Sequence, residues 1–119
     1  MAIVNAQLLD TQLDILIVPT GKTYAITSIM VCNTYSPNDP NPETHDASFD
    51  MHFVMSGETI DNQRSIVVRE LNLPAGETFT FDSEKIVLSA GDKLSFVAQP
   101  GIYAGGATDL AVMVSYLEV

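Results

Sequence analysis

The chain of 119 residues contains no tryptophan, one cysteine, two histidines and only five basic residues. The single cysteine, Cys32, excludes a disulfide within the chain, which is consistent with folding in a reducing cytosol. Five Lys and Arg against fifteen Asp and Glu give a net charge of −10. Nucleic acids and anionic membranes both attract basic surfaces, so we expect neither of them as a partner.

Long apolar runs are missing as well. No stretch approaches the roughly 20 residues of a membrane-spanning helix, and the opening MAIVNAQLLD lacks the basic start and continuous apolar segment of a signal peptide. Apolar residues still make up 46% of the chain and charged residues 17%, which is typical of a globular protein. The length fits one core, so we predict a single β-sandwich domain over 1–119.

Short β-strands dominate the pattern, and helical periodicity is scarce. Segments rich in Val, Ile, Thr, Phe and Tyr are separated by Gly, Pro, Asn and Asp. The predicted strands are 2–9, 12–18, 23–33, 47–55, 64–71, 77–82, 85–89, 93–99 and 109–118. This density of short strands predicts an all-β fold, an antiparallel, jelly-roll-like β-sandwich of eight or nine strands.

The alternation within three strands predicts their surroundings. Segments 23–33 and 109–118 are apolar on both faces, which predicts central strands or a second face covered by a neighbouring subunit. In 47–55 we expect one buried face and one solvent-exposed face, the latter carrying Ser48, Asp50, His52 and Val54. We expect Cys32 to be a small buried core residue, because free cysteine is among the most buried residue types.

A turn pattern occurs three times, as VPTGKTYAI (18–26), LPAGETFTF (73–81) and LSAGDKLSF (88–96). In each copy a glycine precedes an alternating strand, and we expect these glycines to adopt a positive φ in a turn. They are Gly21, Gly76 and Gly91. The GKT of the first copy is not a phosphate-binding loop, because Leu16 stands where that motif requires its first glycine.

The stretch 33–47, NTYSPNDPNPETHDA, is the longest predicted connection between strands. Its prolines favour extended backbone without regular structure, and loops of this length are often functional. We predict that the loop 34–46 projects from the domain and contacts another protein. The glycine-rich segment 100–108 carries a second candidate anchor, although its tyrosine has the alternative of folding back on its own sheet. The candidate contact residues are Tyr35, Asp39, Glu43, His45, Asp46, Ile102 and Tyr103.

The sequence offers few residues that are spaced for metal binding or catalysis. His45, Asp50 and His52 offer nitrogen and oxygen ligands for a transition metal, and three carboxylates of the loop 34–46 offer oxygens for calcium, but neither spacing matches an established site. The chain has no G-x-S-x-G nucleophile elbow. We therefore predict no catalytic, metal or cofactor-binding residues and no enzymatic activity.

Four segments resemble small structural proteins of tailed bacteriophages: GKTYAITSIMVCNT, LPAGETFTFD, KIVLSAGDKLSF and the ending VSYLEV. In such proteins a strand ending in CNT leads into a variable loop, and an LPAGET turn is followed by an LxAGDxLS turn. The likeness covers the chain from Gly21 to Val119, and its motifs are turn and strand signatures.

The resemblance implies a non-enzymatic virion protein, first of all a capsid decoration or cement protein that stabilises the phage head through symmetric protein–protein contacts. It implies a homo-oligomer, dimer or trimer, that contacts other virion proteins such as the major capsid protein after assembly in the host cytoplasm. The alternative is a tail- or fibre-associated host-recognition module, carbohydrate-directed and calcium-assisted. The N-terminal AIVNAQLL is either an arm added to a neighbour's sheet edge or the first strand of its own sheet.

Overall fold

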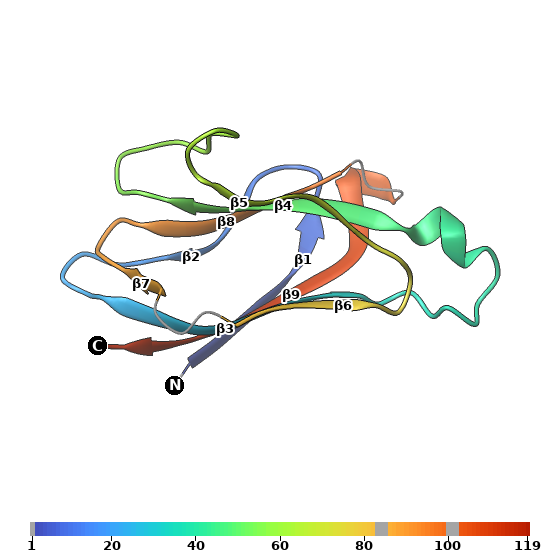
Figure 1. Ribbon diagram of the computed structural model, residues 1–119, viewed down its shortest axis with the longest axis horizontal. Helices are drawn as coiled ribbons and strands as arrows, with labels where there is room; N and C mark the ends of the chain where they lie inside the picture. The colour runs from blue at the N-terminus through green and yellow to red at the C-terminus, as the bar shows by residue number, and fades with distance from the viewer. Residues whose placement is uncertain (1, 83–85, 100–102) are drawn as a thin grey trace.

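The computed structural model describes residues 2–82, 86–99 and 103–119, so the candidate contact residue Ile102 lies outside the described residues. Two antiparallel sheets pack face to face (Figure 1). No helix in the described part of the chain is long and apolar enough to cross a membrane. The elements are β1 (Ala2–Leu9), β2 (Leu13–Ile17), β3 (Tyr24–Asn33), η1 (Pro42–His45), β4 (Ala47–Val54), β5 (Ile66–Leu73), β6 (Thr78–Phe81), β7 (Ile86–Leu88), β8 (Lys93–Ala98), η2 (Ala104–Gly106) and β9 (Ala107–Glu118).

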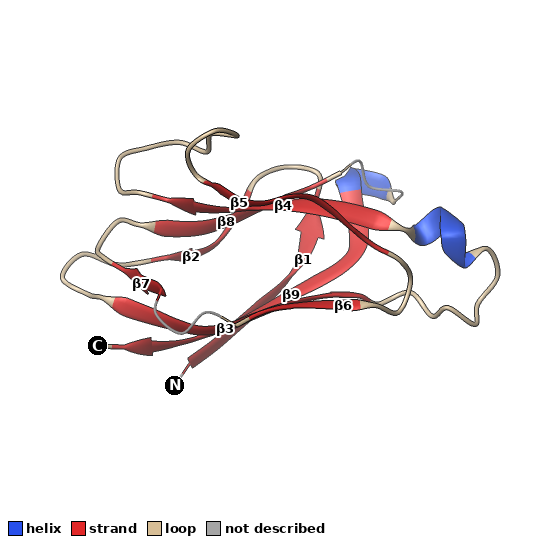
Figure 2. Ribbon diagram, in the orientation of Figure 1, coloured by secondary structure: helices blue, strands red, loops and turns tan. Residues whose placement is uncertain are grey.

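The strand order confirms the predicted all-β sandwich. The first sheet runs β1-β9-β3-β6, with β7 also paired to β3, and the second sheet runs β2-β8-β4-β5. Successive strands repeatedly cross from one sheet to the other, which is the jelly-roll arrangement. Figure 2 shows that strands and loops make up nearly the whole domain, with short helical turns only at one end. The N-terminal segment is an edge strand of its own sheet, paired with β9.

The core lies between the two sheets and follows the period-two alternation of the strands. Phe49 of β4 contacts Phe79 of β6 edge-on at a centroid distance of 5.7 Å and lies 6.0 Å from Phe96 of β8. It therefore ties the second sheet to the first, and truncating such a buried ring typically costs about 3–5 kcal/mol. The apolar side chains at most 1% exposed are Leu8, Val18, Ile29, Val31, Phe49, Met51, Leu94, Phe96, Leu110, Val112 and Val114.

Two predictions about exposure are wrong. The face of β4 that was expected to be wet is buried, with Asp50 9%, His52 0% and Val54 2% exposed. The reason is that residues which follow β4 contact this face: Ser65 Oγ lies 2.9 Å from His52 Nδ1, and the Asp50 carboxylate accepts a 2.6 Å hydrogen bond from the backbone N–H of Glu70. Cys32 is half-buried rather than a core residue, because alternation directs its neighbours Val31 and Asn33 inward.

His52 is a buried histidine on the outer side of the second sheet. Its Nδ1 lies 2.9 Å from Ser65 Oγ. That hydroxyl accepts from the N–H of Asp61 at 2.8 Å and donates its one proton to the carbonyl of Asp61 at 3.0 Å. Nδ1 therefore donates the third bond, and Nε2 is left unprotonated, buried and without a hydrogen-bond partner among the described residues. Burial lowers the pKa of His52, against the opposing effect of the Asp50 carboxylate.

This arrangement predicts acid sensitivity. Because the folded-state pKa of His52 lies below its ordinary value of 6.5, the unfolded chain takes up this proton first, and stability is lost as the pH falls below that value. We expect the free energy of unfolding to decrease between about pH 7 and about pH 5.5. The variant His52→Phe, which has no titrating group here, should show a shallower decrease by chemical denaturation. Equal slopes in the two proteins would contradict the assignment.

Candidate functional site

The loop 34–46 extends from one end of the sandwich, beyond the paired strands (Figure 1). It has internal structure. The hydroxyl of Tyr35 donates to the carbonyl of Pro40 at 2.6 Å, and the loop returns to β4 through the 3₁₀ turn η1. Asn41 precedes that turn with φ 55°, and its carbonyl accepts from both the N–H and the hydroxyl of Thr44. The loop therefore closes on itself.

A cluster of four side chains holds the root of this loop, and we call it the loop-root cluster: Tyr35, His45, Tyr103 and Asp109. The rings of Tyr35 and His45 stack with centroids 3.5 Å apart and planes 3° from parallel. His45 Nδ1 lies 2.7 Å from Asp109 Oδ2 at the start of β9. The hydroxyl of Tyr103 donates to the same carboxylate at 3.0 and 3.2 Å. The cluster thus joins two distant loops to the first sheet.

Asn33 supports the cluster from inside. It is the last residue of β3, and its side chain is 1% exposed. Its amide nitrogen donates to the carbonyls of His45 at 2.8 Å and Leu73 at 2.9 Å, and its amide oxygen accepts from the N–H of Tyr35 at 3.1 Å. A buried amide must satisfy these groups to avoid a desolvation penalty. One side chain therefore fixes both ends of the loop and the turn after β5.

The structure divides the predicted contact residues into two groups. Tyr35, His45 and Tyr103 come together in the loop-root cluster, and Tyr103 folds back onto β9 rather than standing free. The other described candidates, Asp39, Glu43 and Asp46, are exposed on the projecting loop. Sequence reasoning missed Asn33 and Asp109. The sequence did contain a signal for Asn33, because alternation places its amide at an inward position of the apolar strand 23–33.

The charges and hydrogen bonds of the loop-root cluster hold the loop 34–46 in place. Partial burial, together with the hydrogen bond to Asp109 and its negative charge, raises the pKa of the Tyr103 phenol above its ordinary value. The phenol therefore stays protonated and donates to the carboxylate. A His–Asp pair can activate a nucleophile, but here the adjacent Tyr103 hydroxyl donates to the carboxylate at 3.0 and 3.2 Å and lies farther, at 3.4 Å, from His45 Nδ1. This geometry positions the loop.

The side chains weighed as metal ligands are not gathered into one site. His45 belongs to the loop root, whereas Asp50 and His52 lie on the outer side of the second sheet. In the described ranges no group of three or more His, Cys, Asp or Glu side chains is placed to hold a metal ion. The acidic side chains of the loop instead flank a shallow groove lined by Pro37, Pro42, Glu43, Asp46, Pro74 and Ala75.

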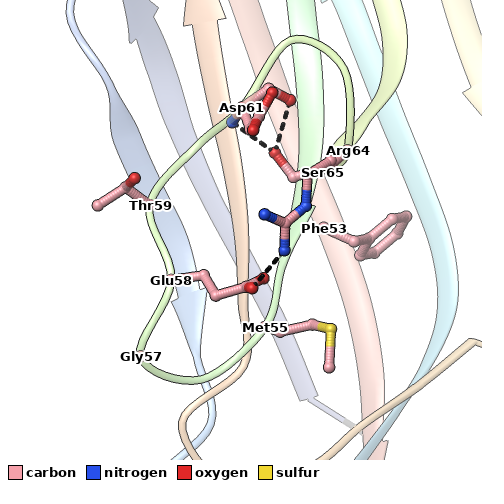
Figure 3. A pocket seen from close by; sticks show the side chains of 8 residues that line it. All are labelled: Phe53, Met55, Gly57, Glu58, Thr59, Asp61, Arg64 and Ser65. Atoms are coloured by element: carbon pink, nitrogen blue, oxygen red, sulfur yellow. Dashed lines mark hydrogen bonds and ion pairs between the residues drawn. The ribbon is translucent and has the colours of Figure 1, made fainter.

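A second hollow, of about 320 Å³, lies under the loop between β4 and β5 (Figure 3). The side chains of Glu58 and Arg64 point toward each other across it and form an ion pair at 2.6 Å. The Ser65 hydroxyl bonds to the backbone N–H and carbonyl of Asp61, and the Asp61 carboxylate accepts from the N–H of Gln63. The Glu58–Arg64 pair is neutral, so among the described residues that line the hollow Asp61 is the one with an uncompensated charge.

Comparisons with protein-family models, with curated proteins and with solved structures found no match. The resemblance to phage proteins consequently stays a prediction. Its turn signatures do correspond to turns here: Gly21, Gly76 and Gly91 have φ of 80°, 80° and 86°, as expected from the repeated pattern.

Pro37 of the loop 34–46 lies against the turn that contains Gly76. A matched pair of glycine variants can test this contact. At Gly76 a Cβ would lie 2.8 Å from Pro37 Cδ, whereas at Gly21 the same φ of 80° meets open space. Gly21→Ala should cost about 1–2 kcal/mol from backbone strain alone. Gly76→Ala should cost more and should displace the loop 34–46, as measured by denaturant unfolding and by hydrogen exchange of the loop amides. Equal losses would show that Pro37 does not dock on this turn.

The cluster itself is tested at Asp109. Asp109→Asn keeps the size of the side chain and the backbone bonds from Thr34 to its carbonyl, but it removes the charge that His45 and Tyr103 contact. A hydrogen bond to a charged group contributes about 1.5–3 kcal/mol, so the amides of the loop should exchange several-fold faster. Asp39→Asn, at the exposed tip, should leave exchange unchanged. If both variants behave alike, the cluster does not hold the loop.

Proposed function

We propose that this chain is a non-enzymatic structural protein of a tailed-phage virion, a head-decoration protein that docks on neighbouring capsid subunits through the loop 34–46. The observation that carries the proposal is the ordered, projecting loop, held at its root by Tyr35, His45 and Asp109. The sequence supports it through the resemblance of the turn and strand motifs in residues 21–119 to those of small structural proteins of tailed phages.

Preorganisation of the loop supports a role in binding. A loop that is already ordered before docking avoids the conformational entropy that a flexible loop loses on binding. The Asn33 amide and the loop-root cluster supply that order from the sandwich side, while the 3₁₀ turn Pro42–His45 leads the loop back into β4.

Charge defines the chemistry of the docking partner. The loop presents the carboxylates of Asp39, Glu43 and Asp46 to solvent on a chain of net charge −10. Acidic groups of this kind favour a surface that displays Lys or Arg side chains and accelerate encounter with it. We therefore propose a basic seam between capsid subunits as the docking site.

The fold is compatible with this role, since viral capsid proteins use jelly rolls, as lectins do. The alternative of calcium-assisted carbohydrate binding draws no support from Tyr24, Tyr35 and Tyr116. The ring of Tyr35 is stacked on His45, and Tyr24 lies against Tyr116 at 4.6 Å, so a face of each ring is occupied. The three loop carboxylates also form no recognisable cation site within the described residues.

The proposal is tested by counting copies and by reversing one charge. Quantitative mass spectrometry of purified virions should find the chain at a fixed integer ratio to the major capsid protein. Glu43→Lys should weaken rebinding to stripped heads by about tenfold or more, because a buried or rim charge pair becomes repulsive. Glu70→Lys makes the same change of charge on an exposed position of β5 and should rebind like the wild-type chain.

Absence of the chain from purified virions would overturn the proposal. A few copies per particle, released with the tails, would exclude head decoration and favour the tail-associated alternative. Equal weakening by both lysine variants would show that net charge, and not the loop, directs docking.

A further inference from the structure

The outer face of the first sheet has an apolar centre that is surrounded by uncharged polar side chains. Alternation turns the residues between the core positions of β1, β3, β6 and β9 outward, and the register sets Met30 opposite Met113 and Cys32 opposite Ala111. Asn5 and Thr78 lie beside them on the flanking strands. The outward residues at the centre of this face are Ile3, Asn5, Gln7, Ser28, Met30, Cys32, Thr78, Thr80, Ala111, Met113 and Ser115.

This absence of charge contrasts with the rest of the molecule. The chain has twenty Asp, Glu, Lys and Arg residues, and the outer side of the second sheet carries an ion pair between Lys93 and Asp14. On the first sheet the nearest outward charge on β9 is Asp109, which is already bonded to His45 and Tyr103. Depletion of charge and enrichment in methionine are typical of the core of a protein–protein interface.

The size of the face suits a small contact. Its four strands comprise 34 residues, which at about 3.4 Å per residue and about 4.8 Å between strands cover roughly 550 Å². A standard interface buries about 800 Å² on each partner, so this face has the size of a small interface. At its centre lies a shallow depression of about 570 Å³, lined by β1, β3, β6 and β9 and mostly apolar. In Figure 1 the described residues form no further layer over this side of the sandwich.

We propose that this face binds a second copy of the chain, sheet against sheet, about a two-fold axis near Met30 and Met113. A partner with a basic surface cannot form ion pairs with this face, because its centre has no carboxylates. Such a partner would bind the acidic loop 34–46 instead. A second copy brings the same thioether and methyl groups, and two such sheets pack about 10 Å apart. The acidic side chains then lie outside the contact, where physiological salt screens them over about 8 Å.

The dimer does not depend on the loop 34–46 or on a role in the virion, so its failure leaves the proposed function untouched. The first test is the molar mass in solution, which light scattering should find to be twice the 12.9 kDa of one chain. Because two chains of net charge −10 repel each other, higher salt should tighten the dimer. A basic partner on an acidic surface would show the opposite salt dependence.

Met113→Glu tests the face directly. A carboxylate at the centre of the contact should raise the dissociation constant at least tenfold, measured by sedimentation velocity. Val67→Glu is the matched control, since Val67 is 44% exposed on the opposite sheet, and this variant should remain a dimer. Circular dichroism checks that both variants fold, and Met30→Glu on the neighbouring strand serves as the second variant of the face if Met113→Glu does not.

Cys32 gives a readout that needs no mutation. It is the only cysteine and lies on the face, so its rate of reaction with a maleimide should fall as protein concentration rises through the dissociation constant. The proposal is overturned by a chain that is monomeric at all concentrations, by a trimer, or by a dimer in which Cys32 reacts at an unchanged rate. Dissociation by Val67→Glu as well as by Met113→Glu would also overturn it.

Discussion

The pairing of β3 with β9 is the interaction on which the rest of the structure depends. The register sets Val31 against Val112 and Ile29 against Val114, and all four are at most 1% exposed. Because successive side chains of a strand point to opposite faces, this one register also decides what faces outward. A shift by one residue would exchange the core of the first sheet with its outer face. The core and the methionine-rich surface are therefore two results of the same pairing.

The same two strands position the loop. Asn33 is the last residue of β3 and Asp109 lies near the start of β9, so their pairing brings an amide and a carboxylate to the same end of the sandwich. The amide binds the backbone on both sides of the loop, and the carboxylate binds the His45 ring. The loop is held at both ends because both partners belong to the central strands, and its acidic tip lies away from the sheet.

The molecule thus separates two kinds of surface. Charge is concentrated on the loop 34–46 and around the second sheet, whereas the outer face of the first sheet is neutral. Electrostatic attraction acts at long range and selects a partner of opposite sign, while apolar burial acts only on contact and suits a like surface. A protein that attaches to a basic scaffold and also associates with itself needs both surfaces, and needs them on different parts of its fold.

The sequence by itself determined the all-β fold, the strands and the conformation of the turn glycines, because alternation and a positive φ depend on residues close together in the chain. It also indicated the double-sided apolar character of β3 and β9. It did not place Cys32 or His52, because their burial depends on which strands lie beside them and on what covers them. The contact of His45 with Asp109 spans 64 positions, and no local pattern encodes a pairing of that kind. Only the tertiary structure decided it, since the order of strands in the two sheets brings the ends of β3, β4 and β9 together.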